Sequence, residues 1–530
     1  MARTPLMQKL LKLTRLAQQA KKEHKDVIEY AEENLHTRRD FLSKSAMATL
    51  AVTALAGCKK MVDYGTNDDS SDNSNGDSAN PSIVIIGAGI AGLNAAFNLQ
   101  NAGVSSTIYD ANTRAGGRMF TAQNILNPGL STELGGEFID SDHYEMKALA
   151  KYFGFPLLDL YSSSELQLSQ NIYYFNGVSY TDNDFLKAIV YYLPAINRDA
   201  NSLSDVIKYN SYSAVDKKFD QMNLEQYFDS INVTGWLREL LLVAYLGEYG
   251  LNTDECNAIN FLYLFGLGPN GLPALYGYSD ERFKVSGGNQ RIVDALYNKL
   301  KNRVHLEHRL VKIASKGKGY ALYFENKNQP VFTDIVLLTL PFTLLRQVEI
   351  DVELPEVKRN AINNLSYGNN SKLLLGFNGR IWRTKYNSVG MSYSDNSTQN
   401  SWDNSQLQPG NDGGLTVYLG GDDAVHLGNG DVNNQAAKYL HSLNEIYPGL
   451  KQTYNHKAYR MVWPTFAFTK GSYSAWSVGQ YTTIAGSEIE TVGNLYFAGE
   501  HTSYNFQGYM NGGAITGHIA ADKILKKINK

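Results

Sequence analysis

Three glycines, Gly87, Gly89 and Gly92, form a G-x-G-x-x-G motif directly after the apolar, β-branched run 83–86. Apolar residues then recur at helical spacing, as at Ile90, Leu93 and Phe97, which predicts a buried strand, a tight turn and a helix, with Ala91 inside the motif expected at the cofactor. The first glycine permits the turn, the second lets the backbone approach a pyrophosphate, and the third lets helix and strand pack closely. Free N–H groups at the helix N-terminus suit an anion. The stretch predicts a dinucleotide site.

A carboxylate at the end of the next strand supports this interpretation. The apolar run 106–109 ends at Asp110, about 20 residues beyond the glycines, where an acceptor for a ribose hydroxyl belongs. The alternative is a solvated loop acid. The two cysteines, Cys58 and Cys256, cannot form a disulfide framework, and no Cys and His spacing suggests a metal site. Redox chemistry would therefore need a cofactor.

Composition narrows the class of protein. The chain has 530 residues, of which 43% are hydrophobic, enough for two or three domains with a sizeable core. Its net charge of −3 does not indicate binding to nucleic acid or to an anionic membrane. Small molecules are the expected partners, and the oligomeric state stays open.

The N-terminal segment 1–58 is expected to lie outside the fold. Arg38 and Arg39 precede an apolar stretch, 46–57, that is too short to span a membrane and ends at Cys58. This order resembles a bacterial twin-arginine signal fused to a lipobox, although the arginine pair could also be coincidental. It implies export by the twin-arginine route to a periplasmic or membrane-anchored lipoprotein. The polar residues 59–81 are expected to form a disordered linker.

Two further glycine turns carry a family resemblance. The first contains Arg114, Gly117 and Arg118, and the second contains Gly135, Gly136 and Glu137. With the first motif, they resemble the flavin amine oxidase superfamily, which includes monoamine, polyamine and L-amino acid oxidases. The resemblance runs over nearly all of residues 82–527. It implies FAD rather than NAD, with both turns against the cofactor and the arginines near its pyrophosphate.

The same resemblance assigns roles to residues farther along the chain. Val311 is expected to touch the adenine end through its backbone, and Lys372 to hold a water at flavin N5. A buried lysine is costly unless paired, so Lys372 needs either a partner or a place in a surface turn. Gly499 and Glu500 end a buried strand, and Glu500 would accept from a flavin sugar-chain hydroxyl.

Two tyrosines bear on the chemistry. Tyr473 and Tyr509 match positions whose rings form a cage before the flavin in monoamine oxidases, and the backbone around Tyr509 and Met510 would face the pyrimidine edge. Ser472 stands where those enzymes carry the cysteine that bonds the flavin, which implies non-covalent FAD. The residues after Gly499 look closer to the amino acid oxidase branch, so the substrate stays open.

The expected fold is α/β, with a split, doubly wound, Rossmann-like FAD-binding domain and a substrate domain of mixed sheet and helices. The FAD-binding domain would comprise 82–158, 281–353 and 484–530. The substrate domain would comprise 159–280, mainly helical, and 354–483.

The implied reaction moves hydride from the carbon of an amine C–N bond to flavin N5. It gives an imine, then an aldehyde or keto acid and ammonia, while molecular oxygen becomes hydrogen peroxide. One alternative is an L-amino acid oxidase, which needs a cation for the substrate carboxylate. Another is a lipid-anchored flavin protein that passes electrons without amine turnover.

Overall fold

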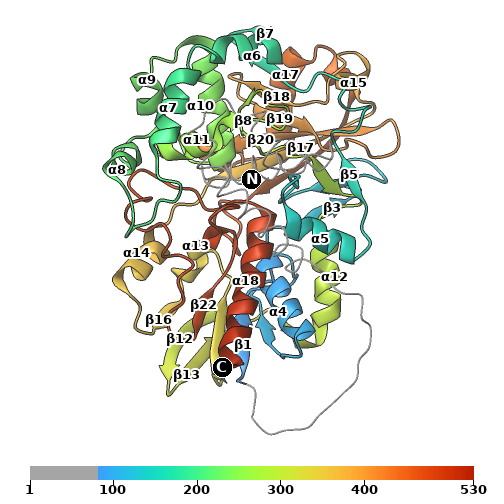
Figure 1. Ribbon diagram of the computed structural model, residues 1–530. Coiled ribbons are helices and arrows are strands. Elements are labelled where there is room, and N and C mark those ends of the chain that lie inside the picture. Colours follow the sequence, from blue (N-terminus) through green and yellow to red (C-terminus); the bar gives the residue numbers. More distant parts are fainter. Residues whose placement is uncertain (1–80, 530) are drawn as a thin grey trace, which may run out of the picture.

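The computed structural model describes residues 81–529, so the expected signal, the anchor at Cys58 and the linker up to residue 80 lie outside the described residues. Two lobes are stacked in Figure 1, with β1, α4 and α18 in the lower lobe and β17–β20 with α6–α11 in the upper lobe. Within residues 81–529, no helix is both long and apolar enough to cross a membrane.

A parallel sheet forms the centre of the lower lobe, in the strand order β11-β2-β1-β15-β22. Its strands are β1 (Ile83–Ile86), β2 (Thr107–Tyr109), β11 (Val304–His305), β15 (Ile335–Leu338) and β22 (Leu495–Phe497). Every residue of β1 and β15 is buried, as expected for parallel strands covered on both faces. The expected α/β class is confirmed, because parallel strands from distant parts of the sequence form this sheet and helices pack against it.

The two faces of β1 pack against different layers. Ile83 and Ile85 belong to a core with the helices, whereas Val84 and Ile86 belong to a core with a second sheet. The helices are α4 (Ile90–Asn101), α12 (Gln290–Leu300) and α18 (Met510–Ile528). The second sheet contains β14 (Val331–Thr333), β13 (Gly319–Phe324), β12 (Leu310–Lys316) and β16 (Glu349–Asp351).

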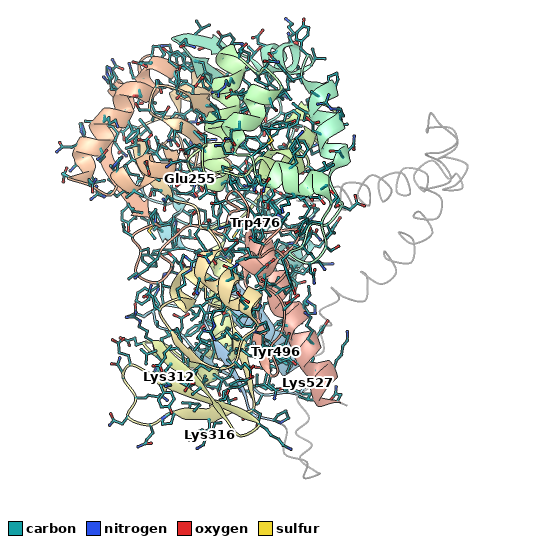
Figure 2. All side chains as sticks on the ribbon, turned by 90° about the vertical axis from the view of Figure 1, so that its left-hand side faces the viewer. Glu255, Lys312, Lys316, Trp476, Tyr496 and Lys527 are labelled. Atoms are coloured by element: carbon teal, nitrogen blue, oxygen red, sulfur yellow. The ribbon has the colours of Figure 1, made fainter. Side chains whose placement is uncertain are left out.

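Helices α4 and α18, from opposite ends of the described chain, lie side by side (Figure 1). Their close approach depends on glycine, since a Cβ on Gly517 would collide with the carbonyl oxygen of Ala91. Lys312 and Lys316 of β12 and Lys527 of α18 lie at the lower end of this lobe (Figure 2).

The upper lobe contains a seven-stranded sheet in the order β21-β17-β20-β19-β18-β6-β7. Its strands are β21 (Tyr454–Val462), β17 (Asn370–Phe377), β20 (Gly413–Gly420), β19 (Gln399–Asp403), β18 (Ser392–Ser394), β6 (Ile172–Phe175) and β7 (Val178–Tyr180). The stretch 159–280, expected to be mainly helical, therefore also contributes two strands to the edge of this sheet.

The rest of that stretch is largely helical, and three of its helices begin with capping boxes, at Thr181, Ser213 and Asn223. Its helices are α6 (Asp182–Ile189), α7 (Leu193–Ser202), α8 (Ala214–Asp220), α9 (Leu224–Ser230), α10 (Gly235–Tyr249) and α11 (Ala258–Leu264). The remaining helices are α5 (Tyr144–Tyr152), α13 (Phe342–Leu345), α14 (Glu356–Asn364), α15 (Ile381–Thr384), α16 (Gly421–His426), α17 (Val432–Ile446), and the 3-10 helices η1 (Lys301–Arg303), η2 (Leu450–Thr453) and η3 (Glu500–Thr502). Short strand pairs are β3 (Thr121–Gln123) with β4 (Ser131–Glu133), β5 (Leu157–Asp159) with β10 (Phe283–Val285), and β8 (Gly266–Leu267) with β9 (Pro273–Ala274).

Candidate active site

A pocket lined by residues of both lobes brings together most of the residues singled out from the sequence. Those in its wall are Gly87, Gly89, Ala91, Asp110, Gly117, Arg118, Gly135, Gly136, Glu137, Lys372, Tyr473, Gly499, Glu500, Tyr509 and Met510. Three others, Gly92, Arg114 and Val311, are not among its lining residues.

The G-x-G-x-x-G turn forms one end of the pocket. A Cβ on Gly89 would meet no atom within 4 Å and would project into open space, and Gly89 is also the N-cap of α4. Gly92 lies behind the turn, where a Cβ would overlap the carbonyl oxygen of Gly87. The turn thus presents bare backbone and a helix N-terminus to the cavity, an arrangement that suits a phosphate.

Asp110 holds this turn as well as lining the pocket. Its carboxylate accepts from the backbone N–H of Ala88 at 2.6 Å and from that of Asn112 at 2.8 Å. Burial raises the pKa of Asp110, and the two N–H bonds oppose that rise. The carboxylate therefore fixes the β1–α4 and β2 turns relative to one another.

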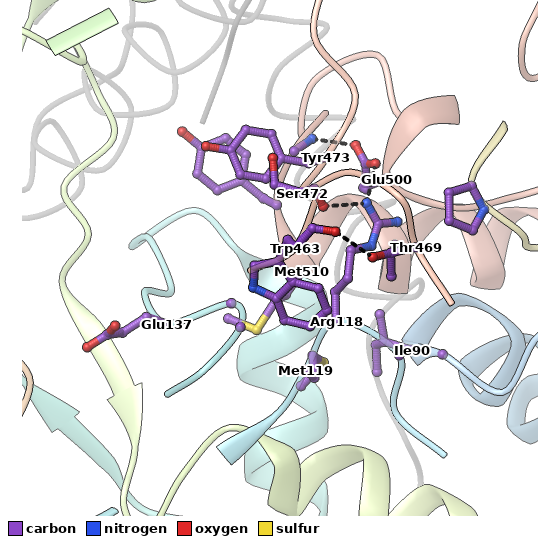
Figure 3. Close-up of a pocket in the computed structure, with 18 of the residues that line it drawn as sticks. Ile90, Arg118, Met119, Glu137, Trp463, Thr469, Ser472, Tyr473, Glu500 and Met510 are labelled. Carbon is purple, nitrogen blue, oxygen red and sulfur yellow. Dashed lines mark hydrogen bonds and ion pairs between the residues drawn. The ribbon is translucent and has the colours of Figure 1, made fainter. Parts of the chain in front are cut away.

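Arg118 and Glu500 form an ion pair in the wall (Figure 3). Arg118 Nη1 donates to Glu500 Oε1 at 2.8 Å and to the carbonyl oxygen of Ser472 at 2.9 Å. Glu500 also accepts from Ser474 N–H and Oγ–H and from Gly508 N–H. Four protein groups thus donate to this carboxylate, which leaves it no open position to accept the expected hydrogen bond from a flavin sugar hydroxyl.

Two residues expected at the cofactor, Arg114 and Val311, direct their side chains elsewhere, and their expected places near the pyrophosphate and at the adenine end stay predictions. Arg114 turns away from the cavity: it donates to the carbonyl oxygens of Gly117 and Met119, and its guanidinium lies 3.9 Å above the Phe120 ring. It therefore braces the glycine turn. Val311 lies at a register shift in β12 with its side chain 37% exposed, because the neighbouring Leu310 takes the inward position.

Lys372 has the partner that its burial requires. Its side chain is 5% exposed, and its ammonium donates to Glu137 Oε2 at 2.8 Å, to Gly135 O at 2.9 Å and to Glu133 O at 3.1 Å. An ammonium has three protons, so all of them are used on the protein. The expectation that Lys372 holds a water therefore does not fit this geometry. The lysine instead fixes the turn that contains Gly135.

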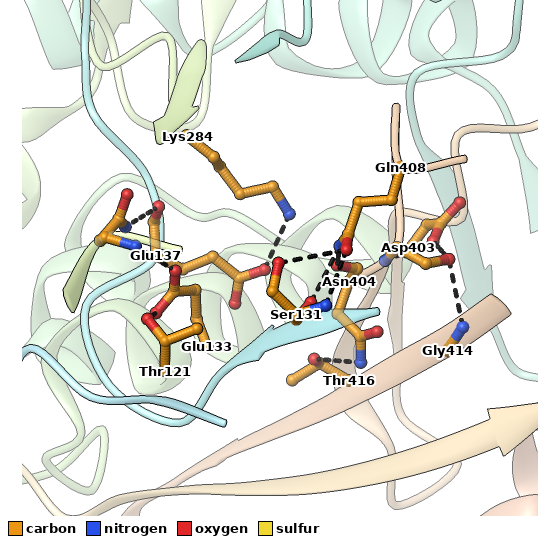
Figure 4. Close-up of polar contacts among 12 residues, drawn as sticks. Thr121, Ser131, Glu133, Glu137, Lys284, Asp403, Asn404, Gln408, Gly414 and Thr416 are labelled. Carbon is orange, nitrogen blue, oxygen red and sulfur yellow. Dashed lines mark hydrogen bonds and ion pairs between the residues drawn. The ribbon is translucent and has the colours of Figure 1, made fainter. Parts of the chain in front are cut away.

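Glu137 is shared by two lysines. Lys284 donates to Glu137 Oε1 at 3.0 Å (Figure 4), whereas Lys372 donates to Oε2. Burial alone would raise the pKa of Glu137, but the two ammonium groups outweigh it and hold that pKa below its usual 4.5. Glu133 accepts from Asn289 N–H and Thr121 Oγ–H (Figure 4), and burial raises its pKa to about 7.

Both tyrosines are held by the end of α10. Tyr473 donates its hydroxyl to the carbonyl oxygen of Glu248 at 2.7 Å and lies 3.0 Å from the Tyr418 hydroxyl. Tyr509 donates to the carboxylate of Glu248 at 3.0 Å. One short helical segment thereby fixes the two rings in the same pocket.

Comparison with known proteins decides the family. A family profile described as flavin containing amine oxidoreductase matches residues 90–525. The chain belongs to this family. An L-amino-acid oxidase of Naja atra is 23% identical to this flavin amine oxidoreductase, over 90% of this chain and 94% of that one. A flavin-containing amine oxidase of Oncorhynchus mykiss is 24% identical, over 84% and 86%.

Solved structures show the same fold. Wild-type putrescine oxidase bound to putrescine superposes with a TM-score of 0.71 at 18% identity, covering 84% of this chain and 99% of that one. Cyclohexylamine oxidase from Brevibacterium oxydans gives 0.75 at 17%, covering 85% and 100%. The expected family and its FAD are confirmed.

The pocket of this flavin amine oxidoreductase fits the cofactor. Gly89 leaves space beside a helix N-terminus, and Arg118 uses only Nη1 in its described hydrogen bonds, which leaves Nε and Nη2 for a phosphate oxygen. Ser472 Oγ lies 2.6 Å from Asn370 Oδ1. Cys256 is the only cysteine among residues 81–529. It is buried and does not line the pocket, so it is not placed to form a thioether with the flavin.

Several pocket residues could not be found from the sequence. They are Glu248, Glu281, Asn400, Trp402 and Tyr418. None stands in a recognisable motif, and only the pairing of distant segments brings them to one cavity. Helical amphipathicity could have indicated that α10 is buried, but not that its last acid faces a pocket.

Proposed function

We propose that this enzyme is an FAD-dependent oxidase of amines, taking hydride from the carbon of a C–N bond and yielding an imine, with oxygen reduced to hydrogen peroxide. The charge of the pocket carries the proposal. Among the described lining residues the cationic side chains are Arg118 and Lys372, and each is paired with a carboxylate. Glu248 and Glu281 also line it. This wall suits a substrate that is cationic in water.

The residues of this chain would bind the cofactor, orient the amine and exclude water. The backbone at Gly89 and the guanidinium of Arg118 would hold FAD, which when bound supplies a two-electron acceptor for hydride. Tyr473 and Tyr509, fixed through Glu248, would position the amine before the ring. Lys372 orients the Gly135 turn and so shapes the wall beside the cofactor.

An L-amino acid oxidase is the second candidate, supported by the sequence likeness to such enzymes. It is less favoured because a substrate carboxylate would enter a wall that contains the carboxylate of Glu248, and both cationic lining residues, Arg118 and Lys372, are already paired with a carboxylate. Like charges brought together in a site of low dielectric repel strongly.

A peroxide assay on the purified holoenzyme tests the proposal. We expect hydrogen peroxide with amines and little with L-amino acids. The reverse preference would establish the second candidate. Bound flavin that no amine or amino acid reduces under anaerobic conditions would instead indicate an electron-passing flavin protein.

We also propose that the enzyme is exported through the twin-arginine route and anchored by a lipid on Cys58. The order of Arg38, Arg39, a short apolar stretch and the cysteine supports this. Replacing both arginines with lysine should retain the protein in the cytoplasm, and Cys58→Ala should release it from membranes. Normal export of the arginine variant would contradict the proposal.

A further inference from the structure

We propose that Lys284, which is not among the residues lining the pocket, acts on the bound cofactor through Glu137 and Lys372. These three buried groups leave one positive charge in the pocket wall, and that charge stabilises the reduced, anionic form of FAD. Lys284 is thus a positioning residue for the electron-accepting half of the reaction. This role depends on bound FAD and not on which amine is oxidised.

Two lysines share one carboxylate in this wall. Lys372 Nζ lies 2.8 Å from Glu137 Oε2, and Lys284 Nζ lies 3.0 Å from Oε1 of the same residue. Lys372 and Glu137 alone would form a neutral pair, so the second ammonium leaves one positive charge uncompensated. The other acceptors of Lys372 are the carbonyl oxygens of Glu133 and Gly135, which carry no formal charge.

The three charged groups are shielded from water. Their side chains are 5% exposed for Lys372, 3% for Glu137 and 7% for Lys284. Lys372 Nζ lies 5.3 Å from the Trp402 ring, and Lys284 Nζ lies 5.3 Å from the Phe138 ring. These two rings pack edge to face, with their centroids 5.6 Å apart. Because little water reaches the charges, their field is weakly screened.

Neighbouring acids do not cancel this charge at about pH 6. Glu133 and Glu281 both interact electrostatically with Glu137. Burial raises the pKa of Glu133 to about 7, and burial and nearby carboxylates raise the pKa of Glu281 well above its usual range. Both acids are therefore largely protonated at that pH. Glu137 stays ionised, because the two ammonium groups hold its pKa below 4.5.

A buried cation without a counter-charge is costly unless an anion comes to lie near it. Glu137 and Lys372 line the pocket that fits FAD, together with Gly135 and Gly136. Hydride brings two electrons and one proton to the neutral flavin ring, so the ring gains one negative charge. The positive charge in the wall therefore favours the reduced ring over the oxidised ring.

The midpoint potential of the bound flavin tests this role without turnover. It is measured by slow reduction of the purified holoenzyme at about pH 6, beside a dye of known potential. Across roughly 10 Å at an effective dielectric of about 20, one unit charge changes an equilibrium constant by about tenfold. Lys284→Met should therefore lower the reduced-to-oxidised ratio about tenfold, which is about 30 mV for a two-electron couple. Glu137→Gln removes the negative charge and should raise the potential instead.

The opposite signs separate this role from a structural one, because both substitutions break the same buried cluster. Lys284→Arg keeps the charge and should keep the potential of the parent. Lys312→Met, which removes a surface cation, should not change it. An unchanged potential in Lys284→Met, or shifts of the same sign in Lys284→Met and Glu137→Gln, would overturn the inference.

The parent enzyme gives a measurement that needs no variant to fold. Its reduced flavin should show the absorbance spectrum of the anion at about pH 6, and the spectrum of the neutral reduced flavin would overturn the inference as well. None of these readouts involves an amine. A failure of the proposed amine oxidation would therefore leave them unaffected, and the two failures are distinguishable.

Discussion

Replacing Lys372 with methionine tests whether this lysine organises the pocket wall. The substitution keeps an unbranched side chain of similar length but removes three donors, so the carbonyl oxygens of Glu133 and Gly135 lose a partner and Glu137 loses one of two ammonium groups. Breaking a buried ion pair by removing one partner costs about 3–5 kcal/mol. Because Lys284 still lies 3.0 Å from Glu137, we expect the lower end, ~3 kcal/mol.

The effect should appear in both stability and rate. A loss of this size lowers the thermal midpoint of a large chain by about 5 °C. The Gly135 turn lines the pocket, so its displacement should slow anaerobic flavin reduction about tenfold, while much of the flavin stays bound. The control is Lys312→Met, which breaks a surface pair with Glu349 and should change stability far less than Lys372→Met does.

A double-mutant cycle isolates the pair. Glu137→Gln alone leaves two buried lysines without a carboxylate, whereas the combined variant with Lys372→Met leaves one. The combined loss should be smaller than the sum of the single losses by about 1–3 kcal/mol. Strict additivity, or a Lys372→Met protein as stable as the parent, would refute the account of Lys372 as a structural cation.

Four further outcomes are expected. Gly89→Val should abolish flavin content, measured by absorbance, because its side chain would fill the open space beside the α4 N-terminus; a fully loaded variant would contradict this. Acid precipitation should release free flavin, since Ser472 cannot form a thioether; colour retained on the polypeptide would disprove it. Tyr473→Ala and Tyr509→Ala should slow flavin reduction in stopped flow more than the Phe variants do, and unchanged rates would remove the tyrosines from the mechanism. The lysines hold the pKa of Glu137 below 4.5, so the stabilisation from its carboxylate is present above that pH and is lost as the pH falls further. Glu137→Gln should therefore make the thermal midpoint less dependent on pH between about pH 5 and 3. A variant as sensitive to acid as the parent would refute this.

The cofactor side could be predicted because its signals are local. A buried apolar run, a glycine motif and a helical period occur within a few residues, and the structure has β1 at Ile83–Ile86 and α4 starting at Ile90. The family resemblance extended this to distant turns such as Gly135. Side-chain orientation, by contrast, could not be predicted for single residues. Arg114 stacks on Phe120 and Val311 faces outward, and motif position alone does not distinguish inward from outward.

The substrate side could not be predicted because it depends on which strands pair. The row from Lys372 through Tyr418 to Asn400 comes from three separate strands, and a shift of one residue in any pairing would turn its side chain to the other face. Glu281 reaches the same cavity from the segment before β10. Such residues have no fixed spacing in the sequence.

This difference explains why FAD could be inferred from the sequence while the amine could not. The expected cofactor contacts are largely backbone atoms in glycine turns, and these turns tolerate few changes because a Cβ at Gly92 or Gly135 would collide with a neighbouring carbonyl. The substrate side of the pocket is lined by side chains such as those of Asn400 and Glu281, and one substitution there changes the charge or polarity of the wall. Exchanging Asn400 or Glu281 should therefore alter which amine is oxidised while the flavin site stays intact. We therefore expect substrate identity to depend on tertiary contacts at this wall rather than on the motifs that define the family.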